Sequence, residues 1–429
     1  MRFVFLLIVF TITILLTSCS EENAPIPPSD RVLSDTTLEI ACPYVTATSV
    51  ELVIHYRRGG TIELLRNGIR ILKFSSLYKD TVFTDQRLTP DVSYVFTAQE
   101  LSDEGEVWKR DTMRVRTYPI STRSLAFREL GPWGGGLAYA YTDVKWMSDG
   151  RLAFTGGLSP LVIFRDDRVE FQDTTLRASG IALDILPDET IVVSATRQLC
   201  FYSAGMCEIL PLAYAESGTL NSLGDGAVVL ARGDGKILRG DVQGVSRFMN
   251  PVHHTSRILD LCVRNGVVYA LIFDEKKRAA TLWRNEGSGS VPILSDGTES
   301  LAPIQIADQL FCVWVSPSET IYVGGRRLYR VTGQRVTRME GFPHGLPSSG
   351  LFAIDGLTDA DFMIVGEGPF FYHFDGDRFR GEIRGTSGSD RNPTARRVHL
   401  TEKRTVILVN QYIPSMLGGS TVTFALHAD

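Results

Sequence analysis

The sequence has little of what most enzymes and nucleic-acid-binding proteins carry. It holds only seven histidines and six cysteines in 429 residues, and no cysteine pair has the spacing of zinc ligands. No serine stands in a nucleophile-elbow motif, and no pair of carboxylates can be assigned acid and base roles. The 44 basic residues do not outnumber the 49 acidic ones and form no basic block, which argues against nucleic-acid binding. We therefore expect no catalytic residues, no metal and no cofactor.

Long hydrophobic runs are also missing, except at the N-terminus. Met1-Arg2 is followed by an apolar run over residues 3–16, and then by Thr17, Ser18 and Cys19. A run of about 14 residues is too short to span a bilayer, which takes roughly 20. A charged start, an apolar run and a small-residue cleavage site are typical of a signal peptide, predicted here for residues 1–18.

The segment Leu16-Thr17-Ser18-Cys19 resembles the bacterial lipobox, whose cysteine is acylated and becomes the first mature residue. The resemblance implies that Cys19 anchors the protein to a membrane, with residues 19–34 as a polar, proline-rich tether. Ser20 is not the aspartate that retains some lipoproteins at an inner membrane, so we favour the outer membrane, facing the periplasm or the surface. The alternative is an ordinary secretory signal in which the cysteine has no role.

Two cysteines are close in sequence. Cys200 and Cys207 flank residues 201–206, which have the pattern of a β-hairpin. A turn centred on Ser203-Ala204 would place them directly opposite each other, within the Cα separation of about 4.4–6.8 Å that a disulfide needs. The pair is a candidate disulfide, and the alternative is two buried thiols acting as small apolar residues.

Residues 35–119 show short alternating strands separated by turns, and strand formers dominate the whole mature chain. Asn67-Gly68 lies between two such strands and predicts a hairpin. Leu88-Thr89-Pro90 is followed four residues later by Tyr94, which resembles the corner of a fibronectin type III domain. The resemblance implies a β-sandwich whose Tyr94 hydroxyl bonds to backbone upstream, and a role as spacer or binding surface. The region departs from the family in lacking an early tryptophan, since Trp108 lies too late.

Residues 120–429 repeat one pattern: an apolar strand, a tight turn, a second apolar strand and two more polar strands. Successive turns are about 40 residues apart, except for one longer interval between 265 and 318. A period near 40 with four strands per unit is typical of a β-propeller. The turns are centred near residues 149, 188, 225, 265, 318, 359 and 402.

The count predicts seven blades, with six or eight as alternatives. The last repeat, from residue 396, holds only three strands, and Ser124–Leu130 could supply its missing outer strand and so close the ring. The repeats resemble loosely defined propellers of exported bacterial proteins, including sensors and photosystem-type assembly factors. The motifs of WD40, kelch and sialidase repeats are absent. The fold class is therefore all-β, a fibronectin type III-like sandwich (35–119) followed by a propeller (120–429).

One predicted loop of the propeller is rich in glycine and aromatic residues. Three consecutive glycines, 134–136, allow close backbone approach, and Trp133 and Tyr139 could stack on sugars or peptide side chains. The alternative is a lead-in segment whose aromatic residues plug a junction.

His253, with His254 beside it, and His344 lie in predicted loops that could line the same mouth and bind a metal, although they lack the spacing of metal ligands. Arg391, in the long loop before the last repeat, could contact a polar ligand. The alternative for all of them is ordinary solvated loops.

Together these features predict a membrane-anchored exported lipoprotein that binds a protein or a glycan through propeller loops, without catalysis and without nucleic acid. The alternative is a polysaccharide hydrolase or lyase with its site at the propeller mouth. A carboxylate pair beside an arginine in the central pocket would favour that alternative.

Overall fold

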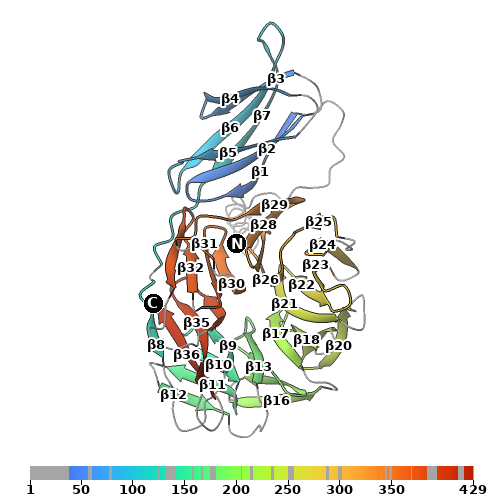
Figure 1. Ribbon diagram of the computed structural model, residues 1–429, viewed down its shortest axis with the longest axis vertical. Coiled ribbons are helices and arrows are strands. Elements are labelled where there is room, and N and C mark those ends of the chain that lie inside the picture. The colour runs from blue at the N-terminus through green and yellow to red at the C-terminus, as the bar shows by residue number, and fades with distance from the viewer. Residues whose placement is uncertain are drawn as a thin grey trace, which may run out of the picture. The chain divides into compact units, whose positions relative to one another are not determined.

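In the computed structural model of the protein, all regular structure of the described residues is β-strand (Figure 1). Within that part of the chain, no helix has the length and apolar character needed to cross a membrane. The described residues are 38–428 without 57–59, 77–79, 124, 131–140, 157–158, 166–167, 174–179, 204, 213–215, 233–235, 250–255, 287–288, 298–301, 344, 347–349, 369, 384–393 and 414–419.

The chain divides into two compact units, with the boundary between Ile120 and Ser121. This boundary lies one residue after the one expected from the sequence.

Unit 1 consists of two antiparallel sheets. Their strand orders are β1-β2-β5 and β4-β3-β6-β7. Alternate residues of both sheets enclose one core, in which Leu52, Ile62 and Phe96 are fully buried. The strands are β1 (Leu38–Val45), β2 (Ser49–Tyr56), β3 (Gly60–Arg66), β4 (Ile69–Ser76), β5 (Thr81–Gln86), β6 (Ser93–Leu101) and β7 (Val107–Arg116).

Two local features of unit 1 agree with the sequence patterns. Asn67 and Gly68 both have positive φ, 49° and 79°, in the turn that joins β3 to β4. The backbone N–H of Thr89 donates a hydrogen bond of 2.8 Å to the Tyr94 hydroxyl, as the Leu-Thr-Pro corner predicts. The hydroxyl therefore bonds to upstream backbone.

Unit 2 contains seven sheets among its described residues, here called sheets 1 to 7 in chain order, and all their strand pairs are antiparallel except one in sheet 4. Sheets 1 to 3 run in sequence order from strand to strand. Sheet 1 consists of β9 (Tyr141–Trp146), β10 (Leu152–Gly156), β11 (Ser159–Arg165) and β12 (Arg168–Gln172). Sheet 2 consists of β13 (Gly180–Ile185), β14 (Ile191–Ala195), β15 (Gln198–Ser203) and β16 (Met206–Pro211). Sheet 3 consists of β17 (Glu216–Ser222), β18 (Val228–Arg232), β19 (Ile237–Asp241) and β20 (Gly244–Met249).

Sheets 4 to 6 follow the same order, and sheet 4 carries one additional strand. The short strand β25 (Ile304–Gln305) pairs in parallel with the outer strand of sheet 4, which accounts for the long interval between the fourth and fifth turns. The other strands of sheet 4 are β21 (Ser256–Arg264), β22 (Val267–Asp274), β23 (Ala279–Asn285) and β24 (Ser290–Ser295). Sheet 5 consists of β26 (Leu310–Val315), β27 (Ile321–Gly325), β28 (Leu328–Thr332) and β29 (Arg335–Arg338). Sheet 6 consists of β30 (Leu351–Thr358), β31 (Asp361–Gly366), β32 (Phe370–Phe374) and β33 (Phe379–Ile383).

Sheet 7 combines both ends of unit 2. Its strands are β34 (Thr394–Leu400), β35 (Thr405–Ile413), β36 (Ser420–Ala428) and β8 (Arg128–Leu130). Strand β8 pairs with β36, Leu130 lying opposite Ala425, so the segment before the first repeat does supply the missing fourth strand. That prediction from the sequence is confirmed.

The turn between the first two strands has the same geometry in several sheets. In sheet 1, the backbone N–H of Met147 donates to the carbonyl of Arg151 at 2.8 Å, and Gly150 has φ 85°. Glu189, Gly226 and Glu319 adopt the corresponding positive φ in sheets 2, 3 and 5. The positive φ explains why glycine recurs here, although two glutamates accept the same conformation.

Neighbouring sheets bury their apolar faces against each other. One core cluster joins sheets 2 and 3, for example Val192 and Leu230. Another joins the first and last sheets, where Phe154 shares a core with Leu408. The last sheet therefore packs against the first.

Candidate functional site

Six residues singled out in the sequence lie outside the described residues. They are the acylation candidate and the five candidate ligand contacts, namely Cys19, Trp133, Tyr139, His253, His344 and Arg391.

The cysteine hairpin has a different register from the one expected. Ser203 pairs with Met206, so the turn lies one residue later, Cys207 is opposite Tyr202, and Cys200 is opposite Ile209. The two cysteines are therefore diagonal neighbours on one face, about 7–8 Å apart at Cα in a regular sheet, rather than directly opposed. Both are free thiols, Cys200 buried and Cys207 exposed.

The first strands of sheets 1 to 6 surround the middle of unit 2 in Figure 1; they are β9, β13, β17, β21, β26 and β30. The first strand of sheet 7, β34, lies next to both β30 and β9. These inner strands carry polar side chains among their apolar residues. The polar residues that interact across the centre are Asp143, Lys145, Asp184, Asp260, Asp355, Arg397 and His399, here called the central cluster.

Four aspartates of the central cluster each connect their own sheet to the following one, namely sheets 1 to 2, 2 to 3, 4 to 5 and 6 to 7. The Asp143 carboxylate accepts a hydrogen bond from the backbone N–H of Leu183 at 3.1 Å, in the next sheet. Equivalent bonds run to Asp184 from Ser222 N–H, to Asp260 from Val313 N–H and to Asp355 from Leu400 N–H, at 2.6, 3.0 and 2.9 Å. These carboxylates thus satisfy backbone donors of a neighbouring inner strand, which would otherwise be buried without a partner.

Arg397 joins parts of unit 2 that are far apart in sequence. Its guanidinium lies 3.8 Å from a carboxylate oxygen of Asp143 in sheet 1 and 4.0 Å from one of Asp260 in sheet 4. Because Arg397 belongs to sheet 7, three inner strands meet at this one side chain. A carboxylate pair beside an arginine therefore does occur at the centre of unit 2.

Lys145 forms the second cationic part of the cluster. Its ammonium lies 3.6 Å from a carboxylate oxygen of Asp184. Burial lowers the pKa of Lys145, but the carboxylates of Asp184, Asp355 and Asp143 outweigh it and raise that pKa overall. Lys145 is therefore charged at neutral pH.

Burial raises the pKa of three aspartates of the central cluster. It raises the pKa of Asp260 to about 6, against the opposing effect of Arg397. Burial also raises the pKa of Asp143 and of Asp355, opposed mainly by Arg397 and by Lys145 respectively. The charge of the cluster consequently depends on pH near neutrality.

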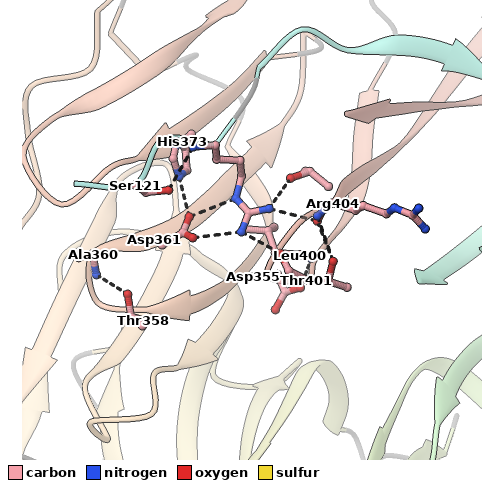
Figure 2. A network of polar contacts seen from close by, with 11 residues as sticks. Ser121, Asp355, Thr358, Ala360, Asp361, His373, Leu400, Thr401 and Arg404 are labelled. Atoms are coloured by element: carbon pink, nitrogen blue, oxygen red, sulfur yellow. Dashed lines mark hydrogen bonds and ion pairs between the residues drawn. The ribbon is translucent and has the colours of Figure 1, made fainter. Parts of the chain in front are cut away.

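A second polar network anchors the segment that enters unit 2 (Figure 2). Arg123 precedes β8, is only 5% exposed, and donates to both carboxylate oxygens of Asp361 at 3.2 and 3.0 Å. It also donates to the carbonyls of Thr401 and Arg404, at 2.8 and 3.2 Å. One guanidinium thus ties the entering segment to sheets 6 and 7.

His373 completes this network from strand β32. Its Nε2 lies 2.7 Å from Asp361 Oδ1. Figure 2 marks this interaction between the two labelled side chains. Burial raises the pKa of Asp361, but the hydrogen bonds from His373 and Arg123 outweigh it, so that pKa is lowered overall. The network is enclosed, and its role is to hold strands together.

Metal binding finds no support in this part of the molecule. No group of three or more histidine, cysteine, aspartate or glutamate residues that could hold a metal ion occurs among the described residues.

The sequence reasoning missed the central cluster. A signal was present, because aspartate recurs inside the first apolar strand of four repeats, at 143, 184, 260 and 355. A charged residue inside an otherwise buried strand needs a partner, which points to a shared polar centre.

Comparison with known proteins supports the architecture. No protein-family model and no curated protein sequence matches the chain. Among solved structures, YCF48 bound to D1 peptide has a TM-score of 0.53 at 11% identity, covering 72% of this chain and 98% of that chain. YCF48 from Cyanidioschyzon merolae has a TM-score of 0.49 at 11% identity, covering 70% of this chain and 98% of that chain. A Dos1 propeller has a TM-score of 0.46 at 9% identity, covering 78% of this chain and 89% of that chain. At these identities the likeness concerns the fold alone, and the likeness to YCF48 supports a β-propeller in this all-β chain.

Proposed function

We propose that the protein is an exported lipoprotein that acts as a non-enzymatic protein-binding scaffold. Cys19 would be acylated and anchor the chain to a membrane, favoured as the outer one, through the tether of residues 19–34. The observation that carries the binding role is the fold likeness to YCF48, a protein solved with a bound peptide.

We assign unit 1 to the fibronectin type III class. Its sheets of three and four strands, in the orders β1-β2-β5 and β4-β3-β6-β7, form a seven-stranded sandwich, and the Tyr94 hydrogen bond marks the corner. Such a unit serves as a spacer or a binding surface rather than as a catalyst.

We assign unit 2 to a closed seven-bladed propeller, with sheets 1 to 7 as its blades. Three observations support closure: β8 completes sheet 7, the last sheet shares a core with the first, and the backbone N–H of Trp146 donates to Nδ1 of His399 across that junction. A closed ring leaves no exposed seam and gives its loops a rigid support.

A rigid ring suits recognition by surface complementarity. Loops from several blades would meet at one mouth, where Trp133 and Tyr139 are the proposed aromatic anchors and a protein is the favoured partner over a glycan. The aspartates of the central cluster accept backbone hydrogen bonds between blades, which supports a structural role for them.

The experiment is crosslinking of the full chain in the intact envelope, compared with two loop variants. Trp133→Ala and Tyr139→Ala should each reduce one specific crosslinked species, whereas Phe171→Ala, an exposed aromatic on an outer strand, should not. A shift in the melting temperature of the purified chain by one peptide class would identify the chemistry of the partner. Unchanged crosslinking in both loop variants would contradict this location of the site.

The alternative of a polysaccharide hydrolase or lyase retains one supporting observation. Asp143 and Asp260 lie on either side of Arg397, and the raised pKa of Asp260, about 6, suits a general acid. However, Asp143 and Asp260 each accept two backbone N–H bonds, which fix both carboxylates in place. Turnover of a polysaccharide that Asp260→Asn abolishes, without unfolding the protein, would establish the enzyme and displace the scaffold proposal.

A further inference from the structure

The outer face of unit 1 carries a row of arginines along one edge strand. Strand β7 is the edge of the four-stranded sheet, and its alternate residues 110, 112, 114 and 116 are exposed. Three of these four are arginines, whereas the residues between them are half-buried or buried toward the sandwich core. The sequence alternation therefore places Arg110, Arg114 and Arg116 on one face, over about 20 Å of strand.

Most of the remaining charge on this face is already neutralised. Glu63 of β3 binds both Arg70 and Lys73 of β4, at 3.0 and 3.4 Å, and accepts a hydrogen bond from Gln99 of β6. Gln99 lies opposite both Glu63 and Arg110, so a polar ladder crosses the sheet from β4 to β7. The single carboxylate of Glu63 leaves one excess positive charge at that end of the ladder.

The row on β7 is less well compensated. Arg110 has one long hydrogen bond, 3.4 Å, to the amide oxygen of Gln99, and Arg114 makes no hydrogen bond or ion pair with any described residue. Arg116 pairs with Asp91 at 2.9 Å, but both side chains are about half exposed, so this pair contributes little stability. Two guanidinium groups are thus available to an external anion.

The neighbouring strand does not extend the charge sideways. The residues of β6 opposite Thr112, Arg114 and Arg116 are Thr97, Val95 and Ser93, all uncharged. The positive charge therefore forms a line rather than a broad patch. A line of positive charge matches a linear polyanion better than it matches the flat surface of a membrane.

We propose that this row binds a linear acidic polysaccharide, with Arg110 and Arg114 contacting successive carboxylate or sulfate groups. Guanidinium binds such groups with two parallel hydrogen bonds, which favours arginine over lysine in this role. Trp108, two residues before Arg110, is 55% exposed and lies at a bulge of the same strand. The inference rests on the proposed export of the protein, because polysaccharides of this class surround the cell.

The test is binding of the full chain to immobilised alginate, a polyuronate, with neutral dextran as the reference. The protein should bind alginate and not dextran, and binding should weaken with added salt because the contacts are exposed charges. The double variant Arg110→Gln/Arg114→Gln should lose affinity about tenfold or more, which corresponds to the loss of about one strong contact. The matched control is Lys276→Gln/Lys277→Gln, which removes the same charge from an exposed turn of unit 2 and should change affinity less than about twofold.

Two results would overturn the proposal. One is equal alginate binding by the arginine variant and the wild type at an equal melting temperature. The other is tighter binding to vesicles of anionic phospholipid than to alginate, with the same dependence on Arg110 and Arg114, which would make a membrane the ligand. Crosslinking through the propeller loops is unaffected by these variants, so failure of this inference and failure of the scaffold proposal are distinguishable.

Discussion

The backbone N–H of Trp146 donates a hydrogen bond of 3.0 Å to Nδ1 of His399, across the junction between the first and last sheets of unit 2. A ring nitrogen that accepts a hydrogen bond carries no proton, so the imidazole is neutral, with its proton on Nε2. Burial, together with the nearby charge of Lys145, holds the pKa of His399 well below its usual range. The junction therefore depends on a histidine that must stay neutral.

We expect the stability of unit 2 to fall as the pH is lowered through about 6.5, the pKa of an unperturbed histidine. Below this pH the unfolded chain takes up a proton at His399 and the folded chain does not, so protonation favours unfolding. The contribution is at most about 1.4 kcal/mol per pH unit. Urea unfolding of the full chain at several pH values between about 5 and 7.5 measures it.

The control for this prediction is His399→Asn, whose side-chain oxygen can replace Nδ1 as the acceptor but cannot titrate. This variant should have a flatter pH profile than the wild type in the same range. An identical slope in the two proteins would show that His399 is not the titrating group.

Asp260 should change the stability of unit 2 with pH in the direction opposite to that of His399. Its folded pKa of about 6 lies above the unfolded value, so the folded state binds the extra proton and is favoured at low pH. As the pH rises from about 4 to about 6, Asp260 should cost the folded protein up to about 3 kcal/mol.

Asp260→Asn should remove this cost while keeping one acceptor oxygen for the N–H of Val313. The difference in unfolding free energy between variant and wild type, measured against pH, should therefore grow in favour of the variant up to about pH 6. Arg397 and Asp143 face Asp260 and remain in place, so a flat difference would mean that Arg397 holds Asp260 ionised throughout.

Removal of Arg123 should strongly destabilise unit 2. Arg123→Ala leaves the Asp361 carboxylate, which is 18% exposed, without its guanidinium partner, and also leaves two carbonyl groups of sheet 7 without this donor. Breaking a buried pair in this way costs about 3–5 kcal/mol. The midpoint of urea or thermal unfolding of unit 2 measures the loss.

Arg123→Lys provides a sharper comparison, since it keeps the charge but not the fork that contacts both oxygens of Asp361. It should be intermediate between the wild type and Arg123→Ala. The matched control Arg165→Ala removes an arginine that is half exposed and pairs with Glu170, and should cost less than about 1 kcal/mol. Equal losses in Arg123→Ala and Arg165→Ala would contradict the anchoring role.

The sequence predicted those parts of the fold that depend on local pattern. The turns near 149, 188 and 225, the hairpin at Asn67-Gly68 and the Tyr94 corner each follow from a few neighbouring residues with strict backbone requirements. The completing strand β8 followed from counting strands per repeat.

Other features could not be predicted from the sequence, because they depend on contacts between residues distant in sequence. Strand β25 has only two residues and no pattern, and its partner was not predictable. The aspartates of the inner strands were visible as polar exceptions, but the position of Arg397 between Asp143 and Asp260 exists only once sheets 1, 4 and 7 surround one centre. The cysteine hairpin turns one residue later than expected, and the alternating pattern of its strands does not fix the position of the turn.

The register of this hairpin also bears on the reactivity of its two thiols. Cys207 is exposed and Cys200 is fully buried, and both are free. Burial raises the pKa of Cys200 to about 12 and also raises that of Cys207. Because the thiolate is the reactive form, iodoacetamide should label Cys207 in the native chain slowly at neutral pH and faster as the pH rises, while Cys200 should react only after unfolding. Mass spectrometry of peptides without reduction measures both, and protection of both cysteines until a reductant is added would mean that the hairpin closes the disulfide despite its diagonal register.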